Sequence, residues 1–173
     1  MTLSLNIEFE KAVRLLSKYM PVADETTRKP VLFHGLRVGI YLYERGYSED
    51  IVLAGVLHDI LEDTEITQEE LREEFGHTVT KLVQASTKDD SVAKEEKTEE
   101  LIKRCVNNGQ DALIIKAADI LDSFKWYSGQ NNKGEIEYCM KNANTIFKYK
   151  PDDFNDPIFE ELKTWQNKFL PIS

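Results

Sequence analysis

The spacing of apolar residues predicts helices along most of the chain. Within residues 6–20 the apolar side chains recur at three- and four-residue steps with charges between them, which is typical of an amphipathic helix. A second helix is predicted to follow Pro30 and to end at Gly46, and another covers residues 135–150. Asp156 and Pro157 suit the N-cap and first turn of a last helix, which is predicted to run through Phe169.

Two segments are too apolar to be surface helices. The segment "EDIVLAGVLHDILED", residues 49–63, can be capped by Ser48 and is apolar almost all round from Ile51 to Leu57. Ala54 and Gly55 within it would allow a neighbouring helix to come close. The segment "DALIIKAADILDSFKWYS", residues 111–128, has the same character. We expect both segments to form central, buried helices.

The remaining segments also favour helices joined by loops. Thr67 and Glu70 have the spacing of a capping box, and Gly76 would end the helix that they begin. We find no internal repeat, no glycine-rich phosphate loop and no strand-like alternation. The fold class is therefore predicted to be all-α. We expect a single domain over residues 1–173, with a core at about 28–128 and the C-terminal helices packing on it.

Composition excludes several classes of partner. Lys and Arg total 22 against 31 Asp and Glu, and the formal net charge of −9 would repel nucleic acid. The sequence has no membrane-length apolar run and no signal-peptide pattern, so we expect a cytoplasmic protein without a membrane partner. Cys105 and Cys139 are not in a metal-binding spacing, and we interpret them as small buried side chains. The oligomeric state is left open.

The stretch "LHDILEDTEI", residues 57–66, places polar groups in a segment otherwise fit to be buried. On one continuous helix, His58, Asp59, Glu62 and Asp63 would share a sector at its C-terminal end. Burying carboxylates costs several kcal/mol per charge unless a cation or hydrogen-bond donors compensate. A metal ion would compensate the charges. The alternative is that the acidic residues face water and that His58 is a hydrogen-bonded core histidine.

His34 and Asp119 favour the metal interpretation, because each is an isolated polar residue on a face that should be packed. Together with His58 and Asp59 they would supply two imidazoles and two carboxylates, which neutralise a divalent cation. Such a set suits manganese, and it is also compatible with iron, zinc or magnesium.

This series of residues resembles the HD-domain metal-dependent phosphohydrolases. The match is narrower over "LAGVLHDILEDTEITQEELREEFGHTVTKLVQASTK" and "IKAAD", which resemble the hydrolase domain of the RelA/SpoT family and the single-domain small alarmone hydrolases. The resemblance runs from about Arg28 to Ser123. It implies a helical bundle with a metal site between its central helices. It also implies manganese-dependent removal of the 3′-pyrophosphate from (p)ppGpp, the alarmone of the stringent response.

The resemblance also implies roles for individual residues. The metal ligands would be His34, His58, Asp59 and Asp119. Glu62 and Asp63 match the family's pair that orients or deprotonates the attacking water. Arg28 and Lys29 resemble the basic pair that packs against the nucleotide, although the loop that carries them is shorter than usual.

The sequence departs from the family pattern where base recognition is expected. Ile120 replaces a basic residue, and Ser123 stands where an asparagine usually helps to bind the nucleotide. Trp126 or Tyr127 could stack on a base, but aromatic residues at helical spacing are more often part of the core. Lys88 and Lys116 could bind phosphate or serve only solubility and packing, and His77 is expected in a surface turn.

The leading hypothesis is a hydrolase acting on ppGpp or a related alarmone such as ppApp. One alternative is an HD phosphohydrolase that acts on another nucleotide, such as a nucleoside monophosphate or NADPH. Another is a binding module that senses a nucleotide without turnover, which the intact ligand set and the Glu62–Asp63 pair disfavour.

Overall fold

The computed structural model describes residues 2–170, and throughout this range the regular secondary structure is helical, without a strand. The described chain falls into two compact units, of which the first ends at Lys88 and the second begins at Asp89. The predicted all-α class is confirmed. The assignment of residues 1–173 to a single domain stays a prediction.

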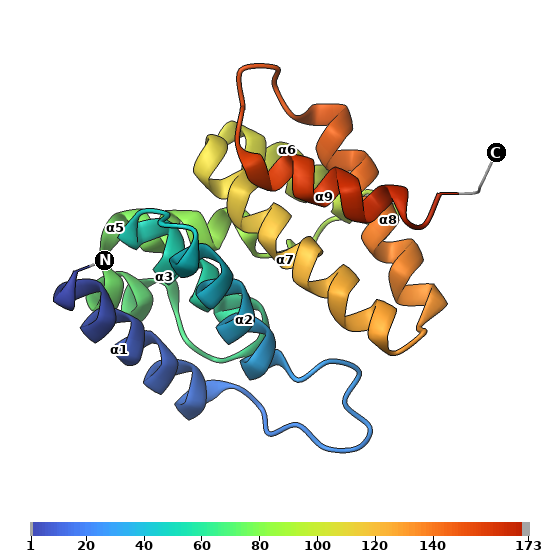
Figure 1. The fold of residues 1–173 in the computed structure, drawn as a ribbon. Helices are drawn as coiled ribbons and strands as arrows, with labels where there is room; N and C mark the ends of the chain where they lie inside the picture. The colour runs from blue at the N-terminus through green and yellow to red at the C-terminus, as the bar shows by residue number, and fades with distance from the viewer. Residues whose placement is uncertain (1, 171–173) are drawn as a thin grey trace. The chain divides into compact units, whose positions relative to one another are not determined.

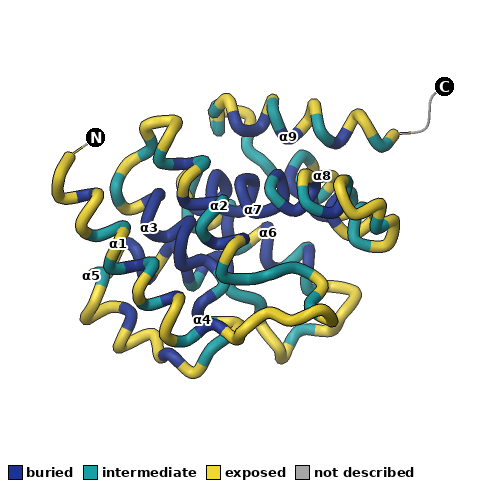
Figure 2. Tube along the Cα trace, turned by 60° about the horizontal axis from the view of Figure 1, so that its bottom comes forward, coloured by how far each residue is buried: buried dark blue, intermediate teal, exposed yellow. Residues whose placement is uncertain are grey.

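A central helix organises the first unit. The unit contains five helices, α1 (Leu3–Tyr19), α2 (Val31–Glu44), α3 (Glu49–Leu57), α4 (Ile60–Asp63) and α5 (Gln68–Ser86). Helix α3 packs against α1, α2 and α5 (Figure 1). Every residue of α3 from Ile51 to Leu57 is buried (Figure 2), as the uniformly apolar sequence predicts.

Glycines let α2 approach α3 closely. A Cβ atom on Gly35 would lie 2.7 Å from the backbone oxygen of Val56, and one on Gly39 would lie 2.2 Å from a Val56 methyl group. On α3, a Cβ atom on Gly55 would lie 2.3 Å from a methyl group of Leu42. The close approach predicted at Gly55 is therefore confirmed, with α2 as the neighbouring helix.

The prediction of one continuous helix over residues 49–63 is wrong. Helix α3 ends at Leu57, His58 and Asp59 form a turn, and α4 follows as a single short helix. The ring nitrogen Nδ1 of His58 lies 2.8 Å from the carbonyl oxygen of Gly55. A continuous α-helix would use that oxygen to accept the backbone N–H of Asp59. The histidine side chain thus competes with the helical hydrogen bond at the point where the helix ends.

Helix α5 confirms two local predictions. Thr67 and Glu70 form the capping box, each side chain accepting the backbone N–H of the other residue. Gly76 has φ 80° and ψ 174°, which interrupts the helical conformation. A positive φ is readily adopted only by glycine. Gly76 therefore separates the helix that begins at Thr67 from the one that continues to Ser86.

The second unit is built around α7 (Gln110–Gly129), which packs against α6 (Lys97–Asn107), α8 (Lys133–Tyr149) and α9 (Pro157–Asn167). Figure 2 shows the buried character of much of α7. Asp156 caps α9 by accepting the backbone N–H of Ile158 at 2.9 Å, with Pro157 in the first turn, as predicted. Cys105 and Cys139 are buried and not disulfide-bonded. Over residues 2–170, none of the helices has the length and apolar character needed to cross a bilayer.

Candidate metal centre

Three predicted ligands converge in the first unit. His34 comes from α2, whereas His58 and Asp59 come from the turn between α3 and α4. The Nε2 atoms of the two histidines are 3.2 Å apart. The Asp59 carboxylate oxygen Oδ2 lies 3.3 Å from Nε2 of His58 and 3.8 Å from Nε2 of His34. Because the helix breaks here, the side chains of the consecutive residues His58 and Asp59 both point toward His34.

The backbone fixes the orientation of His58. A carbonyl oxygen only accepts hydrogen bonds, so the contact with Gly55 places a proton on Nδ1 of His58. With Nδ1 bound to the backbone, the ring turns Nε2 toward His34 and Asp59. Histidine ligands commonly have their second nitrogen bound in this way, which sets the tautomer and the ring direction.

The chemistry of these three groups fits a divalent cation. The His34 side chain is fully buried and that of His58 is 2% exposed, while Asp59 retains access to solvent. One ligand atom from each residue lies within 4.8 Å of the others, as atoms bonded to one ion at about 2.1 Å would. A lone pair on Nε2 and a carboxylate oxygen repel each other unless positive charge lies between them. A cation bound here would supply that charge and pair two neutral ligands with one anionic ligand.

The predicted fourth ligand, Asp119, lies in the second unit on α7. Its Oδ2 atom accepts a hydrogen bond from Nζ of Lys116 at 2.7 Å, and its Oδ1 atom accepts one from Oγ of Ser123 at 3.4 Å. Burial disfavours the charged form of Lys116, but the negative charge and hydrogen bond of Asp119, together with Tyr138 and Cys105, outweigh burial and raise the pKa of the lysine above its usual value. Lys116 and Ser123 therefore both contact Asp119, and its role as a metal ligand stays a prediction.

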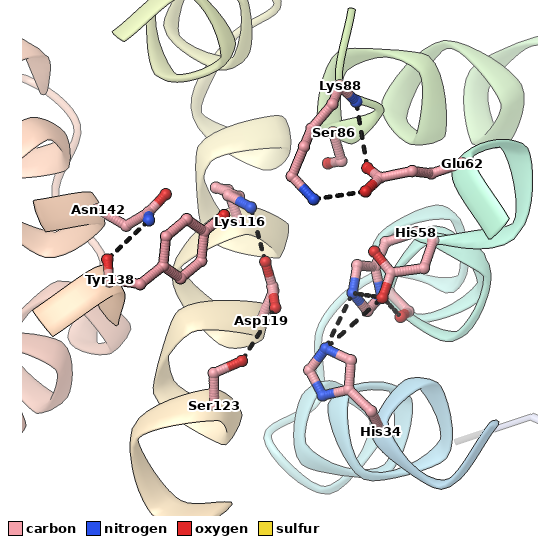
Figure 3. Close-up of polar contacts among 12 residues, drawn as sticks. His34, His58, Glu62, Ser86, Lys88, Lys116, Asp119, Ser123, Tyr138 and Asn142 are labelled. Atoms are coloured by element: carbon pink, nitrogen blue, oxygen red, sulfur yellow. Dashed lines mark hydrogen bonds and ion pairs between the residues drawn. The ribbon is translucent and has the colours of Figure 1, made fainter. Parts of the chain in front are cut away.

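The two carboxylates of α4 have different surroundings. Glu62 is bound by Lys88, whose Nζ contacts Oε1 and whose backbone N–H donates to Oε2 at 3.3 Å (Figure 3). Partial burial raises the pKa of Asp63 to about 6, and the negative charges of Asp59 and Glu62 add to this effect. The Glu62 carboxylate is thus held by the ammonium group of Lys88, whereas the neighbouring Asp63 carboxyl has a raised pKa.

Other predicted site residues have varied environments. Arg28 is exposed and Lys29 half-buried, both in the non-helical stretch before α2, and Trp126 is also half-buried. Tyr127 is buried, consistent with a core aromatic. His77 is exposed, but it lies within α5 just after Gly76 and not in the predicted surface turn.

Sequence reasoning missed two contacts of the site. The Gly55 carbonyl that orients His58 carries no signal in residue type, because every residue has a backbone oxygen. The pairing of Lys88 with Glu62 joins residues 26 positions apart, and no helical periodicity relates them. From the sequence alone, Lys88 is a basic residue that could bind phosphate or serve only solubility.

The comparison with family models identifies the class of protein. The model described as "HD domain" matches residues 12–148, and the chain belongs to this family. The His58–Asp59 pair and His34, which form the candidate metal site described above, lie within the matched residues.

Among curated proteins, the chain is similar to enzymes named as 3′-pyrophosphohydrolases. The chain is 33% identical over 171 residues to guanosine-3′,5′-bis(diphosphate) 3′-pyrophosphohydrolase of Aquifex aeolicus, covering 94% of this chain and 24% of the relative. It is 35% identical over 94 residues to guanosine-3′,5′-bis(diphosphate) 3′-pyrophosphohydrolase MESH1 of Danio rerio, covering 53% of this chain and 52% of the relative. The chain thus spans about a quarter of the first relative and about half of the second.

A solved structure supports the fold. It is described as a metazoan ortholog of SpoT that hydrolyzes ppGpp, and it matches with a TM-score of 0.75 and 21% sequence identity. The match covers 93% of this chain and 94% of that structure. At this level of identity the similarity establishes the helical fold that the two proteins share.

Proposed function

We propose that this protein is a metal-dependent hydrolase that removes the 3′-pyrophosphate from ppGpp or a closely related alarmone such as ppApp, with manganese as its cofactor. The observation that carries the proposal is the convergence of His34, His58 and Asp59 in a chain of the HD-domain family. The relatives named as 3′-pyrophosphohydrolases support the choice of substrate class. A cytoplasmic location accompanies this proposal.

In this proposal His34, His58, Asp59 and Asp119 hold the cation. The buried imidazoles exclude water from their side of the site, and the contact between His58 and Gly55 keeps the ligand nitrogen facing inward. When bound, the metal would lower the pKa of a water molecule and stabilise negative charge on phosphate oxygens.

Glu62 and Asp63 act on the attacking water. A general base works best when its pKa lies near the working pH, and in the metal-free protein burial raises the pKa of Asp63 in this direction, to about 6. Glu62, held by Lys88, offers a fixed acceptor that orients the water. We therefore assign proton acceptance to Asp63 and orientation to Glu62.

Substrate contacts are assigned to Arg28, Lys29 and Ser123. Arg28 and Lys29 lie in the segment leading into α2, the helix that carries His34, and their positive charges suit phosphate oxygens. Ser123 is 4% exposed and donates to Asp119, so its contribution would come mainly through that carboxylate. Ile120 is 1% exposed and offers no hydrogen bond to a base edge. We expect discrimination between guanine and adenine to be weak.

The test is turnover of a substrate panel by the manganese-loaded protein. The panel contains ppGpp, ppApp, nucleoside monophosphates, deoxynucleoside triphosphates and NADPH, with products resolved by ion-exchange chromatography. We expect pyrophosphate release from both alarmones at rates within about tenfold of each other, because the site lacks a base contact that would otherwise discriminate by on the order of 1–3 kcal/mol.

Other outcomes would change the assignment. Rapid turnover of a monophosphate or NADPH with both alarmones left intact would replace the proposed substrate class. Binding of alarmones without any turnover by metal-loaded protein would indicate a sensing module. A strict preference for ppGpp would show that side chains other than Ile120 and Ser123 read the base.

A further inference from the structure

Lys88 contacts both carboxylate oxygens of Glu62, one of the two proposed catalytic residues. Its side-chain Nζ contacts Oε1 of Glu62, and its backbone N–H donates to Oε2 at 3.3 Å. In Figure 3 the Glu62 carboxylate points toward Lys88. Two donors from a single residue fix the direction of the carboxylate as well as its position, as in other two-point contacts.

The backbone donor is itself anchored by a rigid element. Lys88 directly follows Thr87, the C-cap of α5, whose backbone N–H donates to the Val83 oxygen at 3.1 Å. The hydroxyl of Thr87 donates to the same oxygen at 2.9 Å. The end of α5 thus fixes the position of the Lys88 N–H. Because this N–H donates to Glu62, it also fixes the Glu62 carboxylate on the short helix α4.

Helix α4 provides little support of its own for Glu62. It is four residues long, and its N-cap Asp59 makes no side-chain capping hydrogen bond. The Glu62 side chain is 25% exposed, and a glutamate has three rotatable side-chain bonds. Without a partner it would sample several rotamers, whereas orientation of a water molecule requires one.

We propose that Lys88 is a positioning residue that fixes the Glu62 carboxylate for its task at the attacking water. This inference rests on the proposed hydrolase function. It differs from the other role open to a lysine near such a site, which is direct contact with substrate phosphates. A positioning lysine acts only through Glu62, and this dependence can be measured.

A double-mutant cycle tests the dependence. Lys88→Met should lower kcat by about tenfold with KM changed less than about twofold, because a misplaced catalytic group loses rate rather than ground-state binding. Lys88→Arg should restore most of the rate. In a Glu62→Gln background, Lys88→Met should change kcat by less than about twofold, since coupled residues are not additive.

The matched control is Lys81→Met, which removes the same charge from an exposed position of α5. It should leave kcat and KM unchanged. Lys88→Gln provides a second variant if Lys88→Met is poorly folded. An equal loss of rate from Lys88→Met in the wild-type and Glu62→Gln backgrounds, an increase in KM alone, or no loss of rate would overturn the proposal.

Crystal structures of manganese-soaked wild type and Lys88→Met give a readout that does not require activity. We expect the Glu62 carboxylate to be ordered in its observed position in wild type and displaced or disordered in the variant. An unmoved carboxylate in Lys88→Met would overturn the positioning role. If the wild type hydrolyses no substrate of the panel, the proposed function fails, while the structures still decide whether Lys88 positions Glu62.

Discussion

At the residue scale, the candidate metal ligands and the proposed water-activating residues make different contacts. His58 and Asp59 face His34, whereas Glu62 is bound by Lys88. We expect His58→Ala or Asp59→Ala to lose the roughly one metal ion per chain that elemental analysis should find in the wild type. Glu62→Gln and Asp63→Asn should keep the metal and slow hydrolysis by about 10²–10⁴-fold. Loss of metal from both of the latter variants would make them ligands instead.

Asp63 gives a pH-dependent prediction for the metal-free protein. Partial burial raises the pKa of this group from 3.8 to about 6. Between these values the folded state keeps a proton that the unfolded state has released, so the free energy of unfolding falls as pH rises through this window. Asp63→Asn should remove that fall. It should therefore be more stable than wild type at pH 7 and equally stable below about pH 4.

Urea denaturation of chelator-treated protein across pH 3.5–7.5 measures this difference. Glu65→Gln, which removes an exposed carboxylate two residues away, is the control for loss of surface charge and should follow the wild-type curve. A constant difference between Asp63→Asn and wild type at every pH would contradict the assigned titration.

At the element scale, the contact between α2 and α3 brings the two histidines together. Gly35 follows His34 directly, and a Cβ atom there would meet the Val56 backbone oxygen at 2.7 Å. Backbone yields less readily than a flexible side chain, so Gly35→Ala should move α2 away from α3. We expect a loss of about 1–3 kcal/mol in the free energy of unfolding from overpacking.

The same variant should weaken metal binding by about tenfold or more, a loss typical of perturbing the surroundings of a metal ligand. Isothermal titration calorimetry with manganese checks the affinity, and thermal unfolding checks the stability. Gly134→Ala on α8 is the matched control, because a Cβ atom there has its nearest neighbour at 3.9 Å. Unchanged affinity in Gly35→Ala would show that the site tolerates a shift of α2.

At the scale of the whole molecule, the net charge of −9 governs long-range interactions. We expect no binding to duplex DNA or single-stranded RNA with a Kd tighter than about 10⁻⁴ M at physiological salt. The chain lacks the excess of Lys and Arg side chains over acidic ones that drives non-specific binding. Fluorescence anisotropy with labelled oligonucleotides at two salt concentrations is the measurement. Binding that weakens steeply with added salt would reveal a basic surface hidden by the overall charge.

The amino-acid sequence determined the helical class and much of its local detail. Periodicity located the amphipathic helices, the Thr67–Glu70 spacing predicted the capping box, and Asp156 marked the start of α9. These features depend on residues within one or two turns of each other, so local pattern is sufficient. His34, His58 and Asp59 could also be selected as candidate metal ligands from their residue types and from family resemblance, and the structure brings them together.

Tertiary structure decided how those residues are used. The helix ends at Leu57 because His58 takes up the Gly55 carbonyl in the packed site, although the apolar pattern continues to Leu61. The partner of Glu62, Lys88, lies 26 residues away, just after the end of α5. The different surroundings of Glu62 and Asp63 likewise depend on what packs around α4. Such contacts join segments distant along the chain, and only their packing in three dimensions determines which polar groups meet.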